Sequence, residues 1–264
     1  MFDQLPNLSA ICNPAYVAEF AGSVMLAAFG CGSCANSMLP KTKGSGIGYF
    51  MVVTGWAFGI ALAVFLFARA SGAHLNPVIS LALAMFGLFP WEHVIPYTIA
   101  QCLGCATGAV IVYLLYVPYF RESQDTIANR GVFCTFPGIR SKFWSFMAEM
   151  IATGFLLFVI TGLGYAARDG EKVLFDPGFS ALAIGLLILT IGLAMGGPTG
   201  FAMNPARDLF PRIVYIFLPM PAKGDPDWGY AWVPIVAPII GAPIGCLCWR
   251  LLFGDVTIPA LIFS

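Results

Sequence analysis

Two Asn-Pro steps set within apolar sequence are the feature of this chain that most constrains its fold. They are Asn76-Pro77 and Asn204-Pro205, and each follows a glycine-bearing segment and precedes a new apolar run. Asparagine is a favoured helix N-cap and proline a favoured first helical residue, so each step predicts the start of a helix. Because both starts closely follow long apolar spans, we expect two short helices that dip into a membrane and meet to build a pore.

The composition indicates an integral membrane protein. Hydrophobic residues make up 59% of the chain and charged residues only 10%, whereas a soluble domain carries about 25% charged residues. The 13 basic and 13 acidic residues balance, so no basic surface suggests a nucleic-acid partner. Residues 1–13 contain no basic residue and no long apolar core, which argues against a cleavable signal peptide.

Six stretches are apolar and long enough to cross a bilayer, which requires roughly 20 residues. They cover about residues 15–34, 47–68, 94–116, 143–166, 179–195 and 230–253. Two further apolar stretches, about 77–86 and 205–217, begin at the Asn-Pro steps and are too short to span. We therefore expect an all-α membrane protein with six transmembrane helices and two re-entrant half-helices, forming one membrane domain over residues 1–264.

The two halves of the chain repeat the same order of features. Glu19 opens the first span 57 residues before the Asn of its half, and Glu149 opens the fourth span 55 residues before the Asn of its half. Three spans are an odd number, so the second half, about 143–253, enters the membrane from the side opposite to the first half, about 14–117. This pattern predicts an inverted 3+3 repeat with a functional site near the midplane.

The meeting of two half-helix N-termini predicts a pore that repels cations, because positive helix-dipole ends face its centre. Asn76 and Asn204 can aim side-chain N–H groups at a passing oxygen. The non-helical segments before them would expose backbone carbonyls, since irregular backbone at membrane depth must be buried or line a cavity. This predicted carbonyl ladder comprises Gly72, Ala73, His74, Leu75, Thr199, Gly200, Ala202 and Met203.

Four motifs follow one another in order. They are Ala-Glu-Phe at 18–20, Ser-Gly-Ala-His-Leu-Asn-Pro-Val at 71–78, Gly-Phe-Ala-Met-Asn-Pro-Ala-Arg-Asp at 200–208 and Trp-Val-Pro-Ile-Val-Ala-Pro-Ile-Ile-Gly at 232–241. Together they resemble the aquaporin superfamily and, within it, the glycerol-conducting aquaglyceroporins. The resemblance implies a right-handed six-helix bundle, a homotetramer with one pore per subunit, and cytosolic termini. Asp208, Arg212 and Pro234-Ile235 agree with the glycerol-conducting branch.

The resemblance also implies roles for individual residues. The pore-centre motifs correspond to Asn76, Pro77, Val78, Asn204, Pro205 and Ala206, and the selectivity filter to Trp56, Gly192, Phe201 and Arg207. Arg207 would bind hydroxyl groups and repel cations, while the two aromatic rings would face the carbon side of a polyol. Water-selective members carry a bulky His where this chain has Gly192, so the constriction is expected to be wider. Val78 stands where the family usually has Ala, which puts the width of the pore centre in question.

Three titratable residues at membrane depth allow more than one interpretation. Glu19 and Glu149 are candidates for a proton relay, but the resemblance implies that they hold the re-entrant loops through hydrogen bonds. His74 fits a pore-wall residue. A hypothesis is that its protonation near pH 6 reshapes the inner mouth of the pore.

The cysteines do not predict a metal or redox site. Cys31/Cys34 and Cys102/Cys105 form two Cys-x-x-Cys pairs inside apolar spans, with no His or acidic partner nearby. Small buried helix-packing residues are the simpler interpretation. Cys134 lies in a polar loop and is a candidate for a reachable thiol. No metal and no cofactor is expected.

The leading functional hypothesis is a passive channel in the plasma membrane for glycerol, other small uncharged solutes and water. A mainly water-selective channel is the first alternative, which Gly192 disfavours. An ion-coupled transporter would need a coupling site, yet the spans hold no Asp and only the two motif-bound Glu. A membrane enzyme lacks a recognisable nucleophile-base pair or metal cluster. The distribution of Lys and Arg favours an orientation opposite to cytosolic termini, so charge bias leaves the orientation open.

Overall fold

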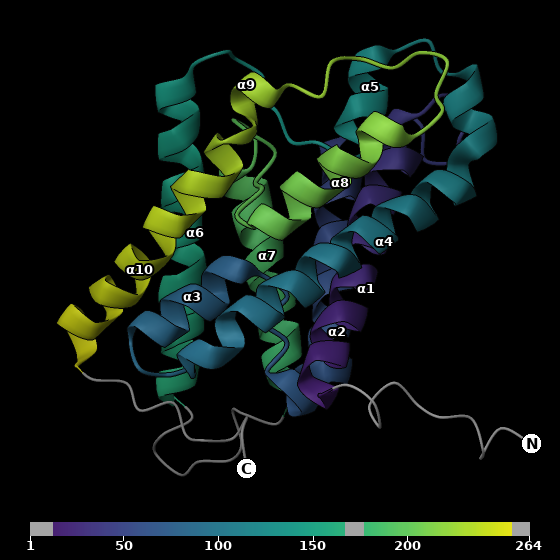
Figure 1. Ribbon diagram of the computed structural model, residues 1–264. Helices are drawn as coiled ribbons and strands as arrows, with labels where there is room; N and C mark the ends of the chain where they lie inside the picture. The colour runs from purple at the N-terminus through teal and green to yellow at the C-terminus, as the bar shows by residue number, and fades with distance from the viewer. Residues whose placement is uncertain (1–12, 167–176, 255–264) are drawn as a thin grey trace, which may run out of the picture.

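This computed structural model describes residues 13–166 and 177–254, and every regular element in these two ranges is a helix (Figure 1). The helices are α1 (Pro14–Met38), α2 (Tyr49–Ser71), α3 (Pro77–Met85), η2 (Trp91–His93), α4 (Val94–Glu122), α5 (Thr126–Gly131), α6 (Lys142–Ala166), α7 (Pro177–Met195), α8 (Pro205–Phe217), α9 (Trp228–Ala231) and α10 (Val233–Phe253). The protein is thus all-α, as predicted.

Six of these helices match the six predicted spans. Five of them, α1, α2, α4, α6 and α10, are long and apolar enough to cross a membrane. The sixth, α7, is shorter at 19 residues, which corresponds to about 28 Å at 1.5 Å per residue and nearly covers a hydrocarbon core of about 30 Å. The chain is therefore a multi-pass integral membrane protein.

The two half-helices begin at the Asn-Pro steps, as predicted. Helix α3 has 9 residues and α8 has 13, lengths of about 14 and 20 Å that cross only part of a bilayer. The side chain of Asn76 accepts a hydrogen bond from the backbone N–H of Val78, and that of Asn204 accepts from Ala206 and Arg207. In Figure 1, α3 lies in the lower half of the bundle and α8 in the upper half.

The helix contacts stay the same when the two halves are exchanged, which supports the inverted repeat. The pairs α1–α4, α1–α2, α4–α8 and α3–α4 correspond to α6–α10, α6–α7, α10–α3 and α8–α10. Contacts between α2 and α7 and between α3 and α8 join the halves.

Glycines allow the closest helix approaches in both halves. A Cβ on Gly104 would lie 2.4 Å from the carbonyl oxygen of Phe20, and one on Gly245 would lie 2.1 Å from that of Gly154. Only a glycine permits such backbone contact, which is how many membrane helices associate. These contacts bring α4 against α1 and α10 against α6.

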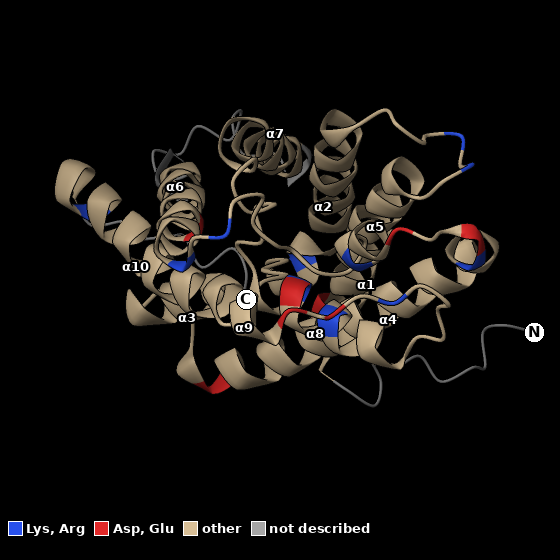
Figure 2. Ribbon diagram, turned by 90° about the horizontal axis from the view of Figure 1, so that it is seen from above, with Lys and Arg blue, Asp and Glu red and all other residues tan. Residues whose placement is uncertain are grey.

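Charged side chains are scarce on the helices. Seen from above, they gather on α8, near α5 and in the neighbouring loops, while long stretches of the bundle are uncharged (Figure 2). Large apolar side chains cover the outside instead, among them Phe65, Leu114 and Leu251, which are 59–75% exposed. Such exposure fits a protein whose outer surface is surrounded by lipid.

Candidate functional site

The segments that precede the two half-helices share one unusual backbone conformation. Positive φ angles occur at Gly72 (82°), Ala73 (47°) and Leu75 (52°), and again at Gly200 (87°), Phe201 (41°) and Met203 (49°). Left-handed backbone costs roughly 1–2 kcal/mol at each residue that carries a Cβ. Because such strain persists only where surrounding contacts hold it, both segments need specific anchors.

Glu19 anchors the first segment. Its carboxylate accepts hydrogen bonds from the backbone N–H groups of His74 (2.8 Å) and Leu75 (2.7 Å). It also accepts from the Ser71 hydroxyl and from the Gln101 amide, each at 2.7 Å. Four donors therefore occupy a carboxylate that is completely buried.

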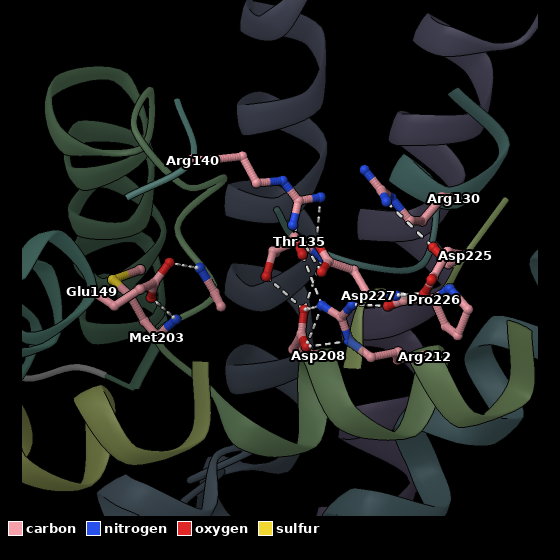
Figure 3. Close-up of polar contacts among 11 residues, drawn as sticks. Arg130, Thr135, Arg140, Glu149, Met203, Asp208, Arg212, Asp225, Pro226 and Asp227 are labelled. Atoms are coloured by element: carbon pink, nitrogen blue, oxygen red, sulfur yellow. Dashed lines mark hydrogen bonds and ion pairs between the residues drawn. The ribbon is translucent and has the colours of Figure 1, made fainter. Parts of the chain in front are cut away.

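Glu149 does the same for the second segment. It accepts hydrogen bonds from the backbone N–H groups of Ala202 and Met203, both at 2.9 Å, and from the Thr199 hydroxyl at 2.6 Å. Figure 3 shows this carboxylate turned toward the segment. Both glutamates are thus engaged with loop donors, a geometry that favours the loop-supporting role over a proton relay.

The two asparagines predicted at the pore centre each bind the segment of the other half. The amide nitrogen of Asn76 donates to the carbonyl oxygen of Met203 at 2.9 Å, and that of Asn204 donates to the carbonyl oxygen of Leu75 at 2.7 Å. This reciprocal pairing was not predicted from the sequence, because no local pattern encodes a bond between residues so far apart. Each amide carries a second N–H, which forms no hydrogen bond with a residue in the described ranges.

In the predicted ladder, the carbonyls of Leu75 and Met203 accept from the two asparagines, whereas several others have no partner among the described residues. Those of Gly72, Ala73, His74, Gly200 and Ala202 accept no hydrogen bond from any described residue. A buried carbonyl without a protein partner needs water or a solute. At membrane depth such carbonyls are tolerated only where they face a cavity.

A narrow cavity joins the predicted filter to the predicted pore centre. Its volume is about 40 Å³, room for on the order of three water molecules. The lining residues are Leu26, Trp56, Ile60, Asn76, Leu156, Ile188, Phe201, Ala202, Met203, Asn204 and Arg207. The structure thus brings three of the four filter residues and both asparagines to one space.

Arg207 supplies unpaired donors to this cavity. Its side chain is 7% exposed, and its guanidinium carbon lies 3.9 Å from the ring centroid of Trp56. Among the described residues, none forms a hydrogen bond or ion pair with the guanidinium. The cation–π contact orients the group, and its N–H donors stay available to a solute.

Gly192 adjoins the cavity without lining it. A Cβ at this position would lie 2.4 Å from Val53 Cγ1 and 3.3 Å from Phe201 Cζ. The volume that a larger residue would need is therefore already taken by Val53 and Phe201. Gly192 acts on the filter by admitting the Phe201 ring rather than by leaving an empty space.

Val78 faces away from the cavity. Its side chain lines an apolar groove of about 450 Å³ that is bounded by α3, α4, α8 and α10 and also includes Pro77 and Pro205. Ala206, its counterpart in the second half, is completely buried. The extra methyl groups of Val78 thus affect the packing behind the half-helices, not the described cavity.

A buried ion pair follows Arg207 on α8. Arg212 contacts Asp208 at 2.8 Å, and both side chains are completely buried. The Asp208 carboxylate accepts hydrogen bonds from the backbone N–H and hydroxyl of Thr135, while Arg212 donates to the carbonyl oxygens of Thr135 and Pro226 (Figure 3). Two loops are thereby fastened to the turn of α8 that carries Arg207.

His74 is enclosed by neutral groups. Its Nδ1 lies 2.9 Å from the Ser80 hydroxyl, and its ring centroid lies 4.7 Å from that of Phe89 and 5.3 Å from that of Tyr97. The side chain is only 6% exposed. Burying a charge in such surroundings is costly, which argues against the hypothesis that His74 is a proton-driven switch.

The structure corrects one expectation about the cysteines. Cys134 is 2% exposed rather than reachable, and burial raises the pKa of its thiol to about 12. Cys31, Cys34, Cys102 and Cys105 are buried among the helices, as expected for packing residues. Within residues 13–166 and 177–254, no three His, Cys, Asp or Glu side chains are grouped to hold a metal ion.

A narrow cavity lined by the caps of two half-helices, inside a bundle of spanning helices, fits the architecture of a membrane channel. The chain matches the family model described as Major intrinsic protein over residues 9–249 and belongs to that family.

Relatives and a solved structure cover nearly the whole chain. A probable glycerol uptake facilitator protein of Thermotoga maritima is 43% identical over 90% of this chain and 99% of its own length. The glycerol uptake facilitator protein of Bacillus subtilis is 43% identical over 92% of this chain and 86% of its own. The X-ray structure of the aquaglyceroporin from Plasmodium falciparum is similar with a TM-score of 0.79, at 30% identity, over 94% of this chain and 98% of the other.

Proposed function

We propose that this protein is a passive, bidirectional channel that conducts glycerol, other small uncharged polyols and water. The observation that carries the proposal is the two-sided filter. The unpaired guanidinium of Arg207 lies beside the aromatic rings of Trp56 and Phe201 in one narrow cavity. A polyol has a hydroxyl edge and a carbon edge, and this filter offers donors to one and an apolar surface to the other.

The remaining polar groups extend the same path. The free N–H groups of Asn76 and Asn204 and the unpaired carbonyls of the two segments replace the water that a solute loses on entering. Glycerol uptake facilitators among the relatives support glycerol as the solute. Gly192 and the aromatic pair favour this solute over exclusive water conduction.

The same elements explain the exclusion of ions. The N-termini of α3 and α8 and the charge of Arg207 place positive potential along the path, which repels cations and hydrated protons. An anion would have to lose most of its hydration shell to enter a cavity of about 40 Å³, and the loss of that shell is costly. We propose channel activity alone, without catalysis and without a cofactor.

The assembly and orientation belong to the same proposal. We propose a homotetramer in the plasma membrane, with one pore in each subunit and with both ends of the chain in the cytosol. In support, α1 begins and α10 ends at the same, lower side of the bundle in Figure 1. The apolar outer faces of the helices supply the surface that lipid and neighbouring subunits require.

Reconstitution into liposomes tests this function. Stopped-flow measurements in a glycerol gradient should show permeability well above that of bare lipid, whereas a sucrose gradient should show none. Uptake should not depend on a sodium or proton gradient. Glycerol permeability equal to that of bare lipid would refute the proposal, and dependence on an ion gradient would replace the channel by a coupled transporter.

A further inference from the structure

Tyr49, the first residue of α2, stands next to the filter but belongs to none of the motifs. Its ring meets Phe201 edge-on, with centroids 6.2 Å apart and an angle of 87° between the ring planes. This edge-to-face arrangement is a favoured aromatic contact. The side chain is 40% exposed, so Tyr49 continues the aromatic wall of the filter toward the Arg207 end of the path.

Two glycines make room for these rings: Gly192 on α7 and Gly196, which directly follows the last residue of α7. A Cβ on Gly196 would lie 2.2 Å from the Tyr49 hydroxyl oxygen and 2.8 Å from Phe201 Cδ1. One turn earlier, a Cβ on Gly192 would lie 3.3 Å from Phe201 Cζ. Both rings therefore occupy volume that side chains at positions 192 and 196 would otherwise fill, and packing against Gly196 defines the position of the Tyr49 hydroxyl.

The Tyr49 hydroxyl has no protein partner in the described part of the chain. By contrast, the hydroxyls of Tyr97, Tyr113 and Tyr215 each donate to a backbone carbonyl. A phenol can both donate and accept, so this hydroxyl is available to water or to a solute.

We propose that the Tyr49 hydroxyl is a further specificity-determining group, which binds a hydroxyl of a small polyol before the solute reaches Phe201 and Arg207. The inference rests on the proposed glycerol conduction and deepens it. A polyol must give up several water hydrogen bonds at the mouth, and Tyr49 replaces one of them next to an apolar ring. Water has a single oxygen, which Arg207 alone can bind, so Tyr49 acts on polyols more than on water.

The Tyr49→Phe variant tests this assignment, because it keeps the ring and removes only the hydroxyl. Glycerol and water permeabilities are measured by stopped flow on the same proteoliposomes. Glycerol permeability should fall about twofold to tenfold, the range expected for one net hydrogen bond, while water permeability stays unchanged. Tyr119→Phe is the matched control, since it removes a hydroxyl from a ring that packs on Tyr116 of α4, and it should change neither permeability.

The outcomes separate this inference from the proposed function. If the wild-type protein and the Tyr49→Phe variant conduct glycerol equally well, the Tyr49 hydroxyl does not bind the polyol. The proposed channel function then stands. An equal fall in glycerol and water permeability would also overturn the inference, because it would indicate a displaced Phe201 ring. If the wild-type protein conducts no glycerol, both proposals fall.

Discussion

At the scale of single residues, the proposed filter depends on polar groups that form no hydrogen bond with neighbouring residues. Arg207 is held by stacking on Trp56 and by its place in the first turn of α8, so its donors are not consumed by the protein. Phe201 reaches the cavity only because α7 presents glycine beneath its ring. The chemistry of the site therefore follows from two absences: no carboxylate among the described residues pairs with Arg207, and position 192 carries no side chain.

A substitution at Gly192 tests the effect of the missing side chain at this position. In Gly192→Ala, the new methyl group would lie 2.4 Å from Val53 Cγ1, and overpacking of this kind costs roughly 1–3 kcal/mol. We expect Phe201 to shift into the cavity and glycerol permeability to fall more than water permeability, as measured by stopped flow. The double variant Gly192→Ala with Val53→Ala should recover most of the glycerol flux, and a lack of recovery would show that Val53 does not transmit the effect.

The enclosure of His74 predicts a channel without a pH switch at this residue. The titratable groups around it are Tyr97, whose ring packs on it, His93 near Tyr97, and Glu19, which binds its backbone N–H. None of the contacts described for the imidazole ring is with a carboxylate, so protonation lacks a counter-charge. Glycerol permeability of proteoliposomes should stay constant between about pH 5 and 8, around the ordinary His pKa of about 6.5. A His74-dependent step in that range would contradict this.

At the scale of elements, α8 combines the functions of a half-helix and of a clamp. Its first turn carries Arg207, and the same turn begins the buried Asp208–Arg212 pair that holds two loops. The Arg140–Asp227 ion pair at 2.8 Å fastens the same two loops nearer the surface (Figure 3). The position of Arg207 is therefore coupled to loops distant in sequence.

The buried pair should show strong coupling between its two residues. Asp208→Leu leaves the Arg212 guanidinium buried and unpaired, a change that typically costs about 3–5 kcal/mol. Thermal unfolding of the detergent-solubilised protein should therefore begin at a clearly lower temperature. The double variant Asp208→Leu with Arg212→Leu should be less destabilised than Asp208→Leu alone. If the double variant loses at least as much thermal stability as Asp208→Leu, the pair contributes only through its separate bonds to the loops.

At the scale of the whole molecule, the inverted repeat places both half-helix tips at one point. Each half contributes one glutamate, one strained segment and one asparagine, and the asparagines cross to the other half. Neither half alone contains a complete pore centre. The filter breaks this symmetry, because Trp56 comes from the first half while Phe201 and Arg207 come from the second.

The orientation in the membrane can be tested with one added thiol. Gly138 lies in the loop before α6, and a Cβ there would have no neighbour within 4 Å. We expect a membrane-impermeant maleimide to label Gly138→Cys on intact cells, because cytosolic termini place this loop outside. The wild-type protein is the control, since Cys134 is buried in the same loop with a pKa of about 12. Labelling only after permeabilisation would reverse the proposed orientation.

The sequence by itself determined the helical fold, the positions of the half-helix starts and the family resemblance. Apolar run lengths, N-cap asparagines and the repeated spacing of Glu19 and Glu149 are local or periodic signals, so they can be read without coordinates. Only the tertiary structure decided which polar groups are hydrogen-bonded within the protein and which remain available to a solute. The crossed bonds from Asn76 to Met203 and from Asn204 to Leu75 depend on contacts between distant segments. So do the packing of Val78 behind the half-helices, the burial of Cys134 and the unpaired Tyr49 hydroxyl. A linear sequence does not record such contacts, because they arise from the packing of one half against the other.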